Sequence, residues 1–413
     1  MIDVAIIGAG AAGIAAARKL QAARLSVQLL EARSSVGGRA HTNISSLGVP
    51  ADCGAAWLHF ADINPLTQIA RDTGYTVIEQ RPDWGGRAHL GRTQPTEDEV
   101  RRWEQAYERN HALIETAARE GRDVAVSDVI PDDEFRARFD AVMTWAVGAE
   151  SREISTVDLA SYADSDVNWA VAEGLGQVVA RAAAGLPVRL STPVKALRWD
   201  ERGVTVVTPG GELAARAAIV TLSTGVLAQG TLEFTPALPR EYVAAFEALP
   251  LGVVNKAFFR VEPAALPFTG TVHVLGNTRT TRTASYAVRP SGQPLVMAFF
   301  GGDLSRELEA SSSLTAFARA ELGELFGQEL LRGIRGEFAT AWHSDPWARG
   351  SYSVARPGCA RLREVLALPV APTLLFAGEA GSRLYYGTLL GAWQEGERAA
   401  ATLIASLGAR SSV

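Results

Sequence analysis

The chain has 413 residues, of which 47% are hydrophobic and 21% are charged, and its formal net charge is −5. This length suits two domains better than one core, and the acidic balance leaves no basic surface for nucleic acid, so no nucleic-acid partner is expected. The two cysteines, Cys53 and Cys359, form no CxxC pair and the histidines show no metal spacing. The sequence therefore predicts neither a disulfide framework nor a metal site.

The apolar run Ile2 to Ile7 alternates too little for a half-exposed strand and predicts a buried parallel strand. Because that strand begins almost at once, it leaves no basic and apolar leader of the kind found in signal peptides, and we expect a cytoplasmic protein. No apolar run approaches the roughly 20 residues that span a bilayer, so membrane insertion is not expected.

A glycine-rich turn, Gly8-Ala9-Gly10-Ala11-Ala12-Gly13, follows this strand and opens an alanine-rich helix. In this pattern the first glycine turns the chain, the second lets the backbone approach a pyrophosphate, and the third lets helix and strand pack closely. The helix N-terminus then offers N–H groups to the anion. The next strand, 27–30, ends at Glu31, where an acid binds ribose hydroxyls and argues against a 2′-phosphate. The pattern predicts a βαβ unit that binds a dinucleotide.

A second glycine pair with arginines follows this acid. The sequence runs Glu31-Ala32-Arg33 and then Val36-Gly37-Gly38-Arg39-Ala40. Such a segment lets backbone and a bidentate cation close on the pyrophosphate from the other side. A simple NAD site does not require this clamp, so the segment favours FAD.

Along the rest of the chain the sequence pattern changes several times between helical and strand-like. Residues from about 97 to 150 follow a helical pattern that indicates a different domain. Short strands between 188 and 221 predict an antiparallel meander attached to the nucleotide-binding sheet. Strands at 256–261, 271–275 and 295–300 precede a helix near 313–326, and a last strand at 374–377 leads through Gly378-Glu379 to a helix from about Leu389 to Leu407.

We therefore predict an α/β fold with α+β elements, in which a Rossmann-like FAD-binding domain is interleaved with a mixed-sheet and helical substrate domain. The FAD-binding domain is expected to comprise residues 1–80, 173–235 and 341–413. The substrate domain is expected to comprise residues 81–172 and 236–340.

Several further motifs lie in a fixed order along the chain. They are Asp52-Cys53-Gly54-Ala55-Ala56-Trp57-Leu58-His59, Leu251-Gly252-Val253-Val254-Asn255-Lys256, the segment from Trp342 to Ser353, Phe376-Ala377-Gly378-Glu379, and the segment from Gly387 to Ala400. Together with the N-terminal turn they resemble the flavin-containing amine oxidase family, which includes monoamine oxidases, polyamine oxidases and flavin histone demethylases. The resemblance extends from residue 2 to residue 400.

The resemblance implies which residues hold FAD. The adenosine diphosphate end would lie on Gly8, Gly10, Ala12, Gly13, Glu31, Ala32, Arg33, Gly38 and Arg39, and adenine on the backbone of Val194. Ala55, Ala56, Trp57, Trp347, Thr388 and Leu389 would line or approach the flavin, and Gly378 and Glu379 the ribityl or phosphate region. Ser351 stands where monoamine oxidases carry a cysteine bonded to the flavin, so FAD is expected to be non-covalent.

Lys256 is the first expected catalytic residue. Of the 40 basic residues only Lys19, Lys195 and Lys256 are lysine, and an ammonium is a compact point charge whereas a guanidinium is a planar fork. A lysine in this sequence is therefore a candidate for a position at which an ammonium is required. The resemblance implies that Lys256 holds a water near flavin N5; the alternative is a solvated cation on a strand.

The resemblance also points to residues on the substrate side. Tyr352 matches one wall of the aromatic cage of monoamine oxidases, and Thr388 replaces the tyrosine of the opposite wall. Tyr385, Tyr386 or Trp393 could restore that wall or serve only in packing. His59 matches a histidine that faces the substrate channel in some polyamine oxidases, although Phe60 replaces the glycine that usually follows.

The expected activity is oxidation of a small-molecule amine by hydride transfer to flavin N5, giving an imine and then an aldehyde or ketone. Molecular oxygen would reoxidise FAD and yield hydrogen peroxide. An amino acid oxidase or another flavin desaturase or dehydrogenase on the same fold is an alternative, as is a non-catalytic FAD-binding sensor or scaffold. The chain is expected to be a monomer or homodimer.

Overall fold

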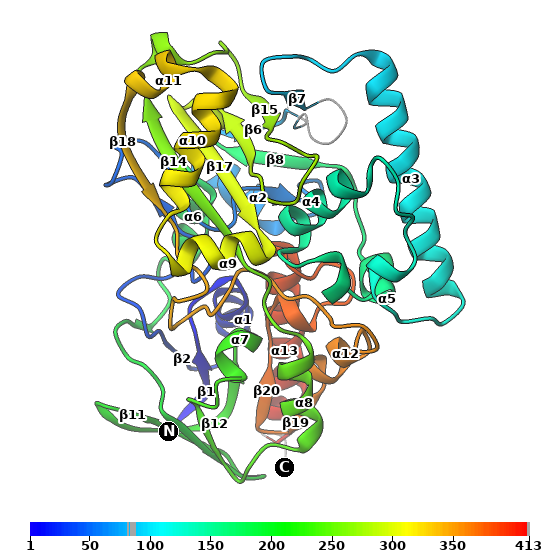
Figure 1. Ribbon diagram of the computed structural model, residues 1–413. Helices are drawn as coiled ribbons and strands as arrows, with labels where there is room; N and C mark the ends of the chain where they lie inside the picture. Colours follow the sequence, from blue (N-terminus) through cyan, green and yellow to red (C-terminus); the bar gives the residue numbers. More distant parts are fainter. Residues whose placement is uncertain (81, 83–87, 411–413) are drawn as a thin grey trace.

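The computed structural model describes residues 1–80, 82 and 88–410. In this part of the chain two large sheets are present, one in the lower half and one in the upper half of Figure 1, and both chain ends lie near the lower sheet. The expected boundary near residue 81 and the last three residues of the expected segment 341–413 lie outside the described residues.

The lower sheet has nine strands and is built from three distant parts of the chain. Strand β1 pairs in parallel with β2 on one side and with β12 on the other, and β10, β11 and β12 form an antiparallel meander. The order is β13-β10-β11-β12-β1-β2-β9, with β20 paired to β12 and β19 paired to β20. The strands are β1 (Ile2–Ile7), β2 (Val27–Leu30), β9 (Val188–Arg189), β10 (Ala196–Trp199), β11 (Val204–Thr208), β12 (Gly211–Val220), β13 (Glu233–Thr235), β19 (Pro369–Ala371) and β20 (Leu374–Phe376).

Two long helices, α1 (Ala11–Ala22) and α13 (Leu389–Arg410), cover one face of this sheet and pack on each other. Small residues allow the close approach: a Cβ on Gly396 of α13 would lie 2.1 Å from the carbonyl oxygen of Ala12. The other face is covered by α8 (Arg240–Ala248) and α12 (Leu362–Ala367), whose apolar side chains pack together with those of the sheet in one buried core. The short helix α7 (Thr224–Leu227) packs on α8.

The upper sheet has six strands in the order β18-β14-β17-β16-β15-β7. All neighbouring pairs are antiparallel except β15 and β7. The strands are β7 (His89–Leu90), β14 (Val254–Val261), β15 (Val272–Leu275), β16 (Ser285–Val288), β17 (Leu295–Gly301) and β18 (Ile334–Ala339). The yellow helices in Figure 1, α9 (Gly302–Ala310), α10 (Leu314–Phe326) and α11 (Gln328–Gly333), bury their apolar side chains against one face.

Strand β14 is buried on both faces, and successive side chains point to opposite sides. Ala257 and Phe259 pack under the helices α9 and α10. Lys256 and Phe258 therefore point to the other face, toward the N-terminal part of the chain. The register pairs Lys256 with Phe299 of β17, so these two side chains share that face.

A helical segment completes the fold on the right of Figure 1, where the long cyan helix α3 runs beside α4 and α5. The helices are α3 (Glu97–Arg119), α4 (Arg136–Val147) and α5 (Thr156–Ser161). Trp103, Phe139 and Met143 lie in their common core. The remaining strands and α-helices are β3 (Thr42–Asn43), β4 (Ala51–Asp52), β5 (Leu58–His59), β6 (Val77–Ile78), β8 (Asn168–Val171), α2 (Pro65–Asp72) and α6 (Leu175–Ala182).

The predicted α/β fold with a Rossmann-like unit and a mixed sheet is confirmed. None of the helices in the described part of the chain combines the length and apolarity needed to cross a bilayer. The described residues also contain no group of three or more His, Cys, Asp and Glu residues that could hold a metal ion.

Candidate active site

The glycine turn after β1 forms a cradle that only glycine fits. Gly8 has φ +104°, a region that side chains disfavour. A Cβ on Gly13 would lie 2.1 Å from the carbonyl oxygen of Gly8, so α1 can start close to β1 only without a side chain there. Gly10 is the N-cap of α1, and the N–H of Gly37 donates to the carbonyl oxygen of Ala9 at 2.8 Å. Gly38, with φ +59°, packs on Gly10.

Glu31 lies at the end of β2 and closes one side of this cradle. Its buried carboxylate accepts hydrogen bonds from the N–H groups of Ala9 at 2.8 Å and Arg33 at 2.9 Å. Its carbonyl oxygen accepts from the N–H of Thr192 at 2.7 Å, which brings the segment that contains Val194 alongside. Half-buried Ala32 connects Glu31 to Arg33.

Arg33 ties the N-terminal cradle to the last third of the chain. Its Nη2 atom lies 2.8 Å from both carboxylate oxygens of Asp345, and both side chains are about four-fifths buried. The N–H of Trp347 donates to Asp345 Oδ1 at 2.8 Å, whereas the Trp347 side chain is 44% exposed. The predicted flavin contact of Trp347 remains a prediction.

Arg39 and Glu379 form the second connection across the cradle. Arg39 Nη1 donates to Glu379 Oε1 at 2.8 Å and to the carbonyl oxygen of Ser351 at 2.6 Å. Glu379 opens the 3-10 turn Glu379–Gly381 after Gly378 and also accepts from the N–H of Gly387 at 2.8 Å. Burial alone would raise the pKa of Glu379, but Arg39, the Ser353 hydroxyl and Arg363 outweigh burial and lower it.

These features fit FAD. The cradle lacks side chains where a pyrophosphate must approach, the N-terminus of α1 opens on it, and Arg39 follows directly on Gly38, which packs on Gly10. Arg39 uses only Nη1 toward the described residues, so its Nε and Nη2 donors are left for a phosphate oxygen. Glu31 supplies the acceptor that a ribose needs.

Lys256 of β14 is buried, with only 4% of its surface exposed, so it is not a solvated strand cation. Its Nζ atom donates to the carbonyl oxygens of Asp52 at 2.8 Å and Gly54 at 2.6 Å. Burial lowers the pKa of Lys256 to about 8, although Asp52 and Cys53 act in the opposite direction. Lys256 therefore stands at the beginning of the segment that carries Ala55, Ala56 and Trp57.

This segment is held close to the clamp. The N–H of Ala55 donates to the carbonyl oxygen of Arg39 at 3.1 Å, and a Cβ on Gly54 would lie 1.7 Å from that oxygen. Ala56 and Trp57 are half-buried and line a hollow with His273 and Phe258. The rings of Trp57 and His273 lie 6.4 Å apart. Burial lowers the pKa of His273 to about 4, so its imidazole is uncharged at neutral pH.

Tyr352 and Thr388 lie near each other but play different local roles. The hydroxyl of Tyr352 donates to the carbonyl oxygen of Trp145 at 2.7 Å, and a Cβ on Gly387 would lie 3.5 Å from that of Tyr352. Thr388 precedes α13: its hydroxyl accepts from the N–H of Gly391 at 3.0 Å and donates to the carbonyl oxygen of Tyr385 at 2.6 Å. Thr388 is thus the N-cap of the helix that begins at Leu389.

His59 lies beside the same segment. Its Nδ1 atom is 2.6 Å from Asn168 Oδ1, and burial lowers its pKa despite Asn168 and Asp164. Phe60 adopts φ +54°, a left-handed conformation that glycine adopts more readily than other residues. The ring of Phe60 meets that of Tyr385 edge-on at 4.8 Å.

Two of the three aromatic residues considered for the cage serve in packing. Tyr386 lies under the guanidinium of Arg363 and donates to the carbonyl oxygen of Asp158. Trp393 is buried in the core around α1 and α6 and donates to Glu397. Both side chains are less than 8% exposed.

The hydroxyl of Ser351, which by resemblance stands where monoamine oxidases carry a flavin-bonded cysteine, is already engaged. Its Oγ atom donates to the carbonyl oxygen of Val254 at 2.8 Å and accepts from the N–H of the same residue at 2.9 Å.

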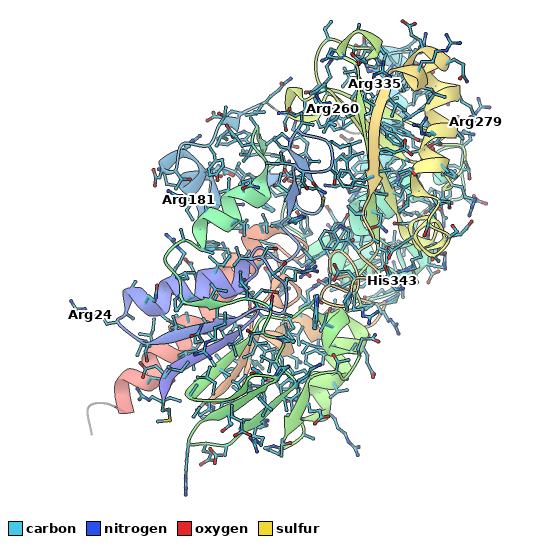
Figure 2. All side chains as sticks on the ribbon, turned by 90° about the vertical axis from the view of Figure 1, so that its left-hand side faces the viewer. Arg24, Arg181, Arg260, Arg279, Arg335 and His343 are labelled. Atoms are coloured by element: carbon cyan, nitrogen blue, oxygen red, sulfur yellow. The ribbon has the colours of Figure 1, made fainter. Side chains whose placement is uncertain are left out.

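His343 belongs to the motif that runs from Trp342 to Ser353. It is exposed at the junction of the halves that contain the two large sheets, where Figure 2 labels it.

Sequence reasoning missed several buried polar residues of the site. Asn255, the neighbour of Lys256, donates to Ser305 and Glu309 and accepts from Thr340 and Trp342. Asp158 and Arg363 form a buried ion pair behind Glu379. Asn255 belongs to the motif that ends in Lys256, but no local pattern distinguishes Asp158 or Arg363.

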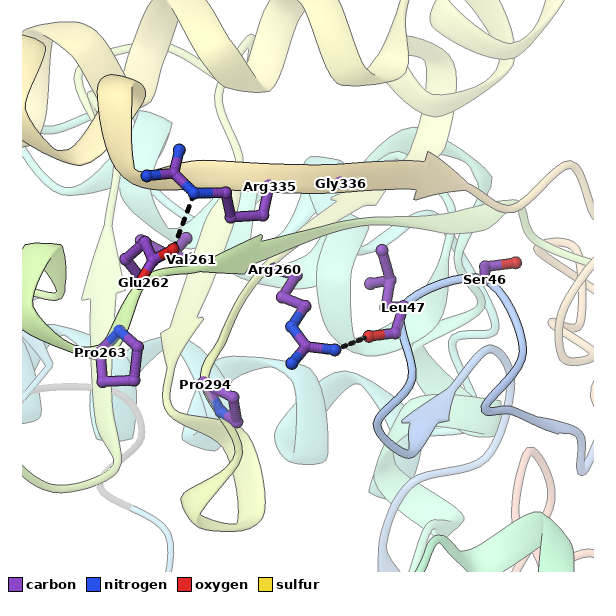
Figure 3. A pocket seen from close by; sticks show the side chains of 9 residues that line it. All are labelled: Ser46, Leu47, Arg260, Val261, Glu262, Pro263, Pro294, Arg335 and Gly336. Carbon is purple, nitrogen blue, oxygen red and sulfur yellow. Dashed lines mark hydrogen bonds and ion pairs between the residues drawn. The ribbon is translucent and has the colours of Figure 1, made fainter.

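A further hollow of about 400 Å³ lies away from these residues (Figure 3). It is lined by the ends of β14 and β18 and the loop at Ser46 and Leu47. Its two arginines are engaged: Arg335 binds Glu262 at 2.7 Å and Arg260 donates to the carbonyl oxygen of Leu47. Figure 2 shows both at the outer end of the six-stranded sheet.

Comparison with known proteins bears on the same residues. A family model described as flavin containing amine oxidoreductase matches residues 106–404, and one described as an NAD(P)-binding Rossmann-like domain matches residues 6–73. Polyamine oxidase 2 of Arabidopsis thaliana is 29% identical over 434 residues, covering 96% of this chain and 87% of the relative. Lysine-specific histone demethylase 2 of Homo sapiens is 25% identical over 448 residues, covering 98% of this chain and 53% of the relative.

Solved structures show the same fold. Cyclohexylamine oxidase from Brevibacterium oxydans has a TM-score of 0.81 at 22% identity, covering 98% of this chain and 99% of its own. A cofactor-binding redesign of putrescine oxidase has a TM-score of 0.78 at 22% identity with the same coverage. Since the first family model spans more than two thirds of the sequence, the chain belongs to the flavin-containing amine oxidoreductases and is an FAD-dependent enzyme of the amine oxidase type.

Proposed function

We propose that this enzyme oxidises the C–N bond of a small-molecule amine by hydride transfer to flavin N5. The product is an imine, which hydrolyses to an aldehyde or ketone, and oxygen takes the electrons to give hydrogen peroxide. The observation that carries the proposal is the buried ammonium of Lys256 at the start of the segment expected to line the flavin.

Lys256 has the donors for the role of holding a water. An ammonium has three N–H donors, and among the described residues two carbonyl oxygens, those of Asp52 and Gly54, accept from it. The third donor can orient a water beside N5. The fixed positive charge also favours the electron-rich reduced cofactor as oxygen approaches, without Lys256 acting as a base.

The substrate side is proposed to lie between Lys256 and the rings around it. Phe299 shares the face of the sheet with Lys256, whose Nζ atom is 5.7 Å from the centre of that ring. Tyr352 supplies the one cage wall. The neighbouring hollow beside Trp57 is lined mainly by apolar side chains, and no arginine occurs among its described lining residues. Without an arginine to bind a substrate carboxylate, and with the acidic Asp52 in its lining, this hollow favours an amine over an amino acid.

The cofactor contacts assigned by resemblance are proposals of the same kind. Glu31 is proposed to bind the ribose, Arg39 the pyrophosphate, and the backbone of Val194 the adenine. FAD is proposed to be non-covalent because the hydroxyl of Ser351 cannot replace the bond that a cysteine forms. Precipitating the protein with acid should then leave the yellow colour in solution, whereas colour in the pellet would contradict non-covalent binding.

Anaerobic mixing of the yellow protein with four panels tests the proposal: primary amines, polyamines, N-methylated amines and amino acids. Bleaching of the flavin absorbance by a member of the first three panels, followed by peroxide release when air is admitted, is expected. Bleaching only by amino acids would indicate an amino acid oxidase. If nothing in the four panels bleaches the flavin, the proposed activity is wrong.

A further inference from the structure

A buried ion pair joins the helical segment to the C-terminal part of the cofactor site. Arg363 of α12 donates from Nε to Asp158 Oδ1 at 2.6 Å and from Nη2 to Oδ2 at 2.8 Å. The two side chains are 1% and 2% exposed and lie 205 positions apart in the sequence. A charge buried this deeply requires its partner, because an unpaired ion in the interior is strongly destabilising.

The guanidinium of Arg363 has one orientation because all five of its N–H donors are engaged. The three donors that do not bind Asp158 reach the hydroxyl of Ser353 at 2.7 Å, the carbonyl oxygen of Ala380 at 3.1 Å and that of Ser353 at 3.3 Å. The Cζ atom of Arg363 lies 3.9 Å from the centre of the Tyr386 ring. Arg363 is therefore a fixed point in the structure.

Ser353 connects this fixed point to Glu379. Its hydroxyl accepts from Arg363 and donates to Glu379 Oε2 at 2.7 Å, and its N–H donates to Oε1 at 3.2 Å. Glu379 in turn holds Arg39 Nη1. The charges thus alternate from Asp158 through Arg363 and Glu379 to Arg39, with the serine hydroxyl bridging the middle pair.

We propose that Arg363 is a positioning residue for the cofactor: through Ser353 and Glu379 it orients Arg39 toward the pyrophosphate, and through Asp158 it ties this orientation to the helical segment. The inference rests on the proposed placement of FAD on Arg39. It predicts that Arg363 and Ser353, to which no direct contact with the cofactor is assigned, contribute to the affinity for FAD.

Ser353→Ala is the deciding variant because it removes the bridging hydroxyl and leaves the Asp158–Arg363 pair in place. Titrating apoprotein with FAD should give a Kd about tenfold higher than in the unchanged protein, the range expected for losing a hydrogen bond to a charged group. On acidification the variant should also lose its FAD affinity at a higher pH than the unchanged protein does. The reason is that Glu379 has lost one of the groups that keep it ionised. A merely structural serine would not move this pH profile.

Thr373→Val is the matched control. Thr373 is also fully buried and donates its hydroxyl to a carbonyl oxygen, that of Asp200, but it lies in the turn between β19 and β20 and takes no part in the row of charges. This variant should lose stability and keep the FAD affinity and its pH profile. Arg363→Lys, which keeps the charge without the fork, should raise the Kd as Ser353→Ala does.

An unchanged Kd and pH profile in Ser353→Ala would overturn the inference. The readout is FAD binding, not amine oxidation, so a protein that binds FAD but bleaches with no amine would refute the proposed activity and still test the positioning role.

Discussion

The Nζ atom of Lys256 lies 2.6 Å from the carbonyl oxygen of Gly54, a residue 202 positions earlier in the chain. This bond joins the six-stranded sheet to the segment that follows the N-terminal cradle. It also explains why burying the ammonium is tolerated: two carbonyl dipoles replace the water that Lys256 has lost.

The first prediction concerns the charge of Lys256. Because burial lowers its pKa to about 8, the side chain is cationic below that pH and neutral above it. The rate constant for reoxidation of the reduced flavin by oxygen, followed by stopped-flow absorbance, should fall as the pH rises through about 8. In Lys256→Met, reoxidation should be slow at every pH, and the change in its rate near pH 8 should be absent. Lys195→Met, at an exposed lysine, should match the unchanged protein; a step that persists in Lys256→Met would remove Lys256 from the mechanism.

The second prediction concerns His273 and acid stability. Burial lowers its pKa to about 4 from an unfolded value near 6.5, so the unfolded chain binds more protons between these values. The folded state therefore keeps its full stability above pH 6.5 and loses about 3 kcal/mol as the pH falls to 4. In urea unfolding, His273→Phe should reduce this loss, whereas His41→Gln, at an exposed histidine, should not. Equal losses in the two variants would contradict the assignment.

The third prediction tests the cradle. Gly13→Ala would place a methyl group 2.1 Å from the carbonyl oxygen of Gly8, so the start of α1 must move away from β1. We expect a loss of about 1–3 kcal/mol in unfolding free energy and little bound FAD after purification. Gly270→Ala, where a Cβ meets no atom within 4 Å, should change neither quantity. Normal FAD content in Gly13→Ala would show that the cradle tolerates displacement.

The local geometry of the cradle could be predicted from the sequence because it depends on neighbours. Gly8, Gly13 and Glu31 lie within one βαβ unit, and the strand expected at 27–30 is observed at those residues. Lys256 was conspicuous because lysine is rare in this chain. In each case the residue type itself carries the signal, through φ, size or the kind of charge.

The long-range ion pairs could not be predicted in this way. Arg33 and Asp345 are 312 positions apart, and Arg363 and Asp158 are 205 apart. Because arginine occurs throughout this sequence, the sequence alone does not distinguish the fully buried Arg363 from an exposed arginine. Only the fold, which places Asp158 of α5 against Arg363 of α12, makes it distinct. The role of Thr388 was equally hidden, because a threonine before a helix fits both a cap and a cage position.

The fourth prediction separates these two roles of Thr388. As the N-cap of α13 its hydroxyl satisfies the N–H of Gly391, and removing it should cost about 1 kcal/mol. Thr388→Ala should therefore lower the unfolding free energy by this amount, and Thr388→Ser, which keeps the hydroxyl, should restore it. If Thr388 acts only as a cap, Thr388→Ser should also keep the unchanged protein's kcat/KM for an amine that bleaches the flavin. If the methyl group of Thr388 contacts the substrate, as its cage position implies, Thr388→Ser should raise KM while stability stays unchanged. Measuring unfolding and kinetics on the same two variants distinguishes a residue that starts a helix from one that also shapes the substrate site.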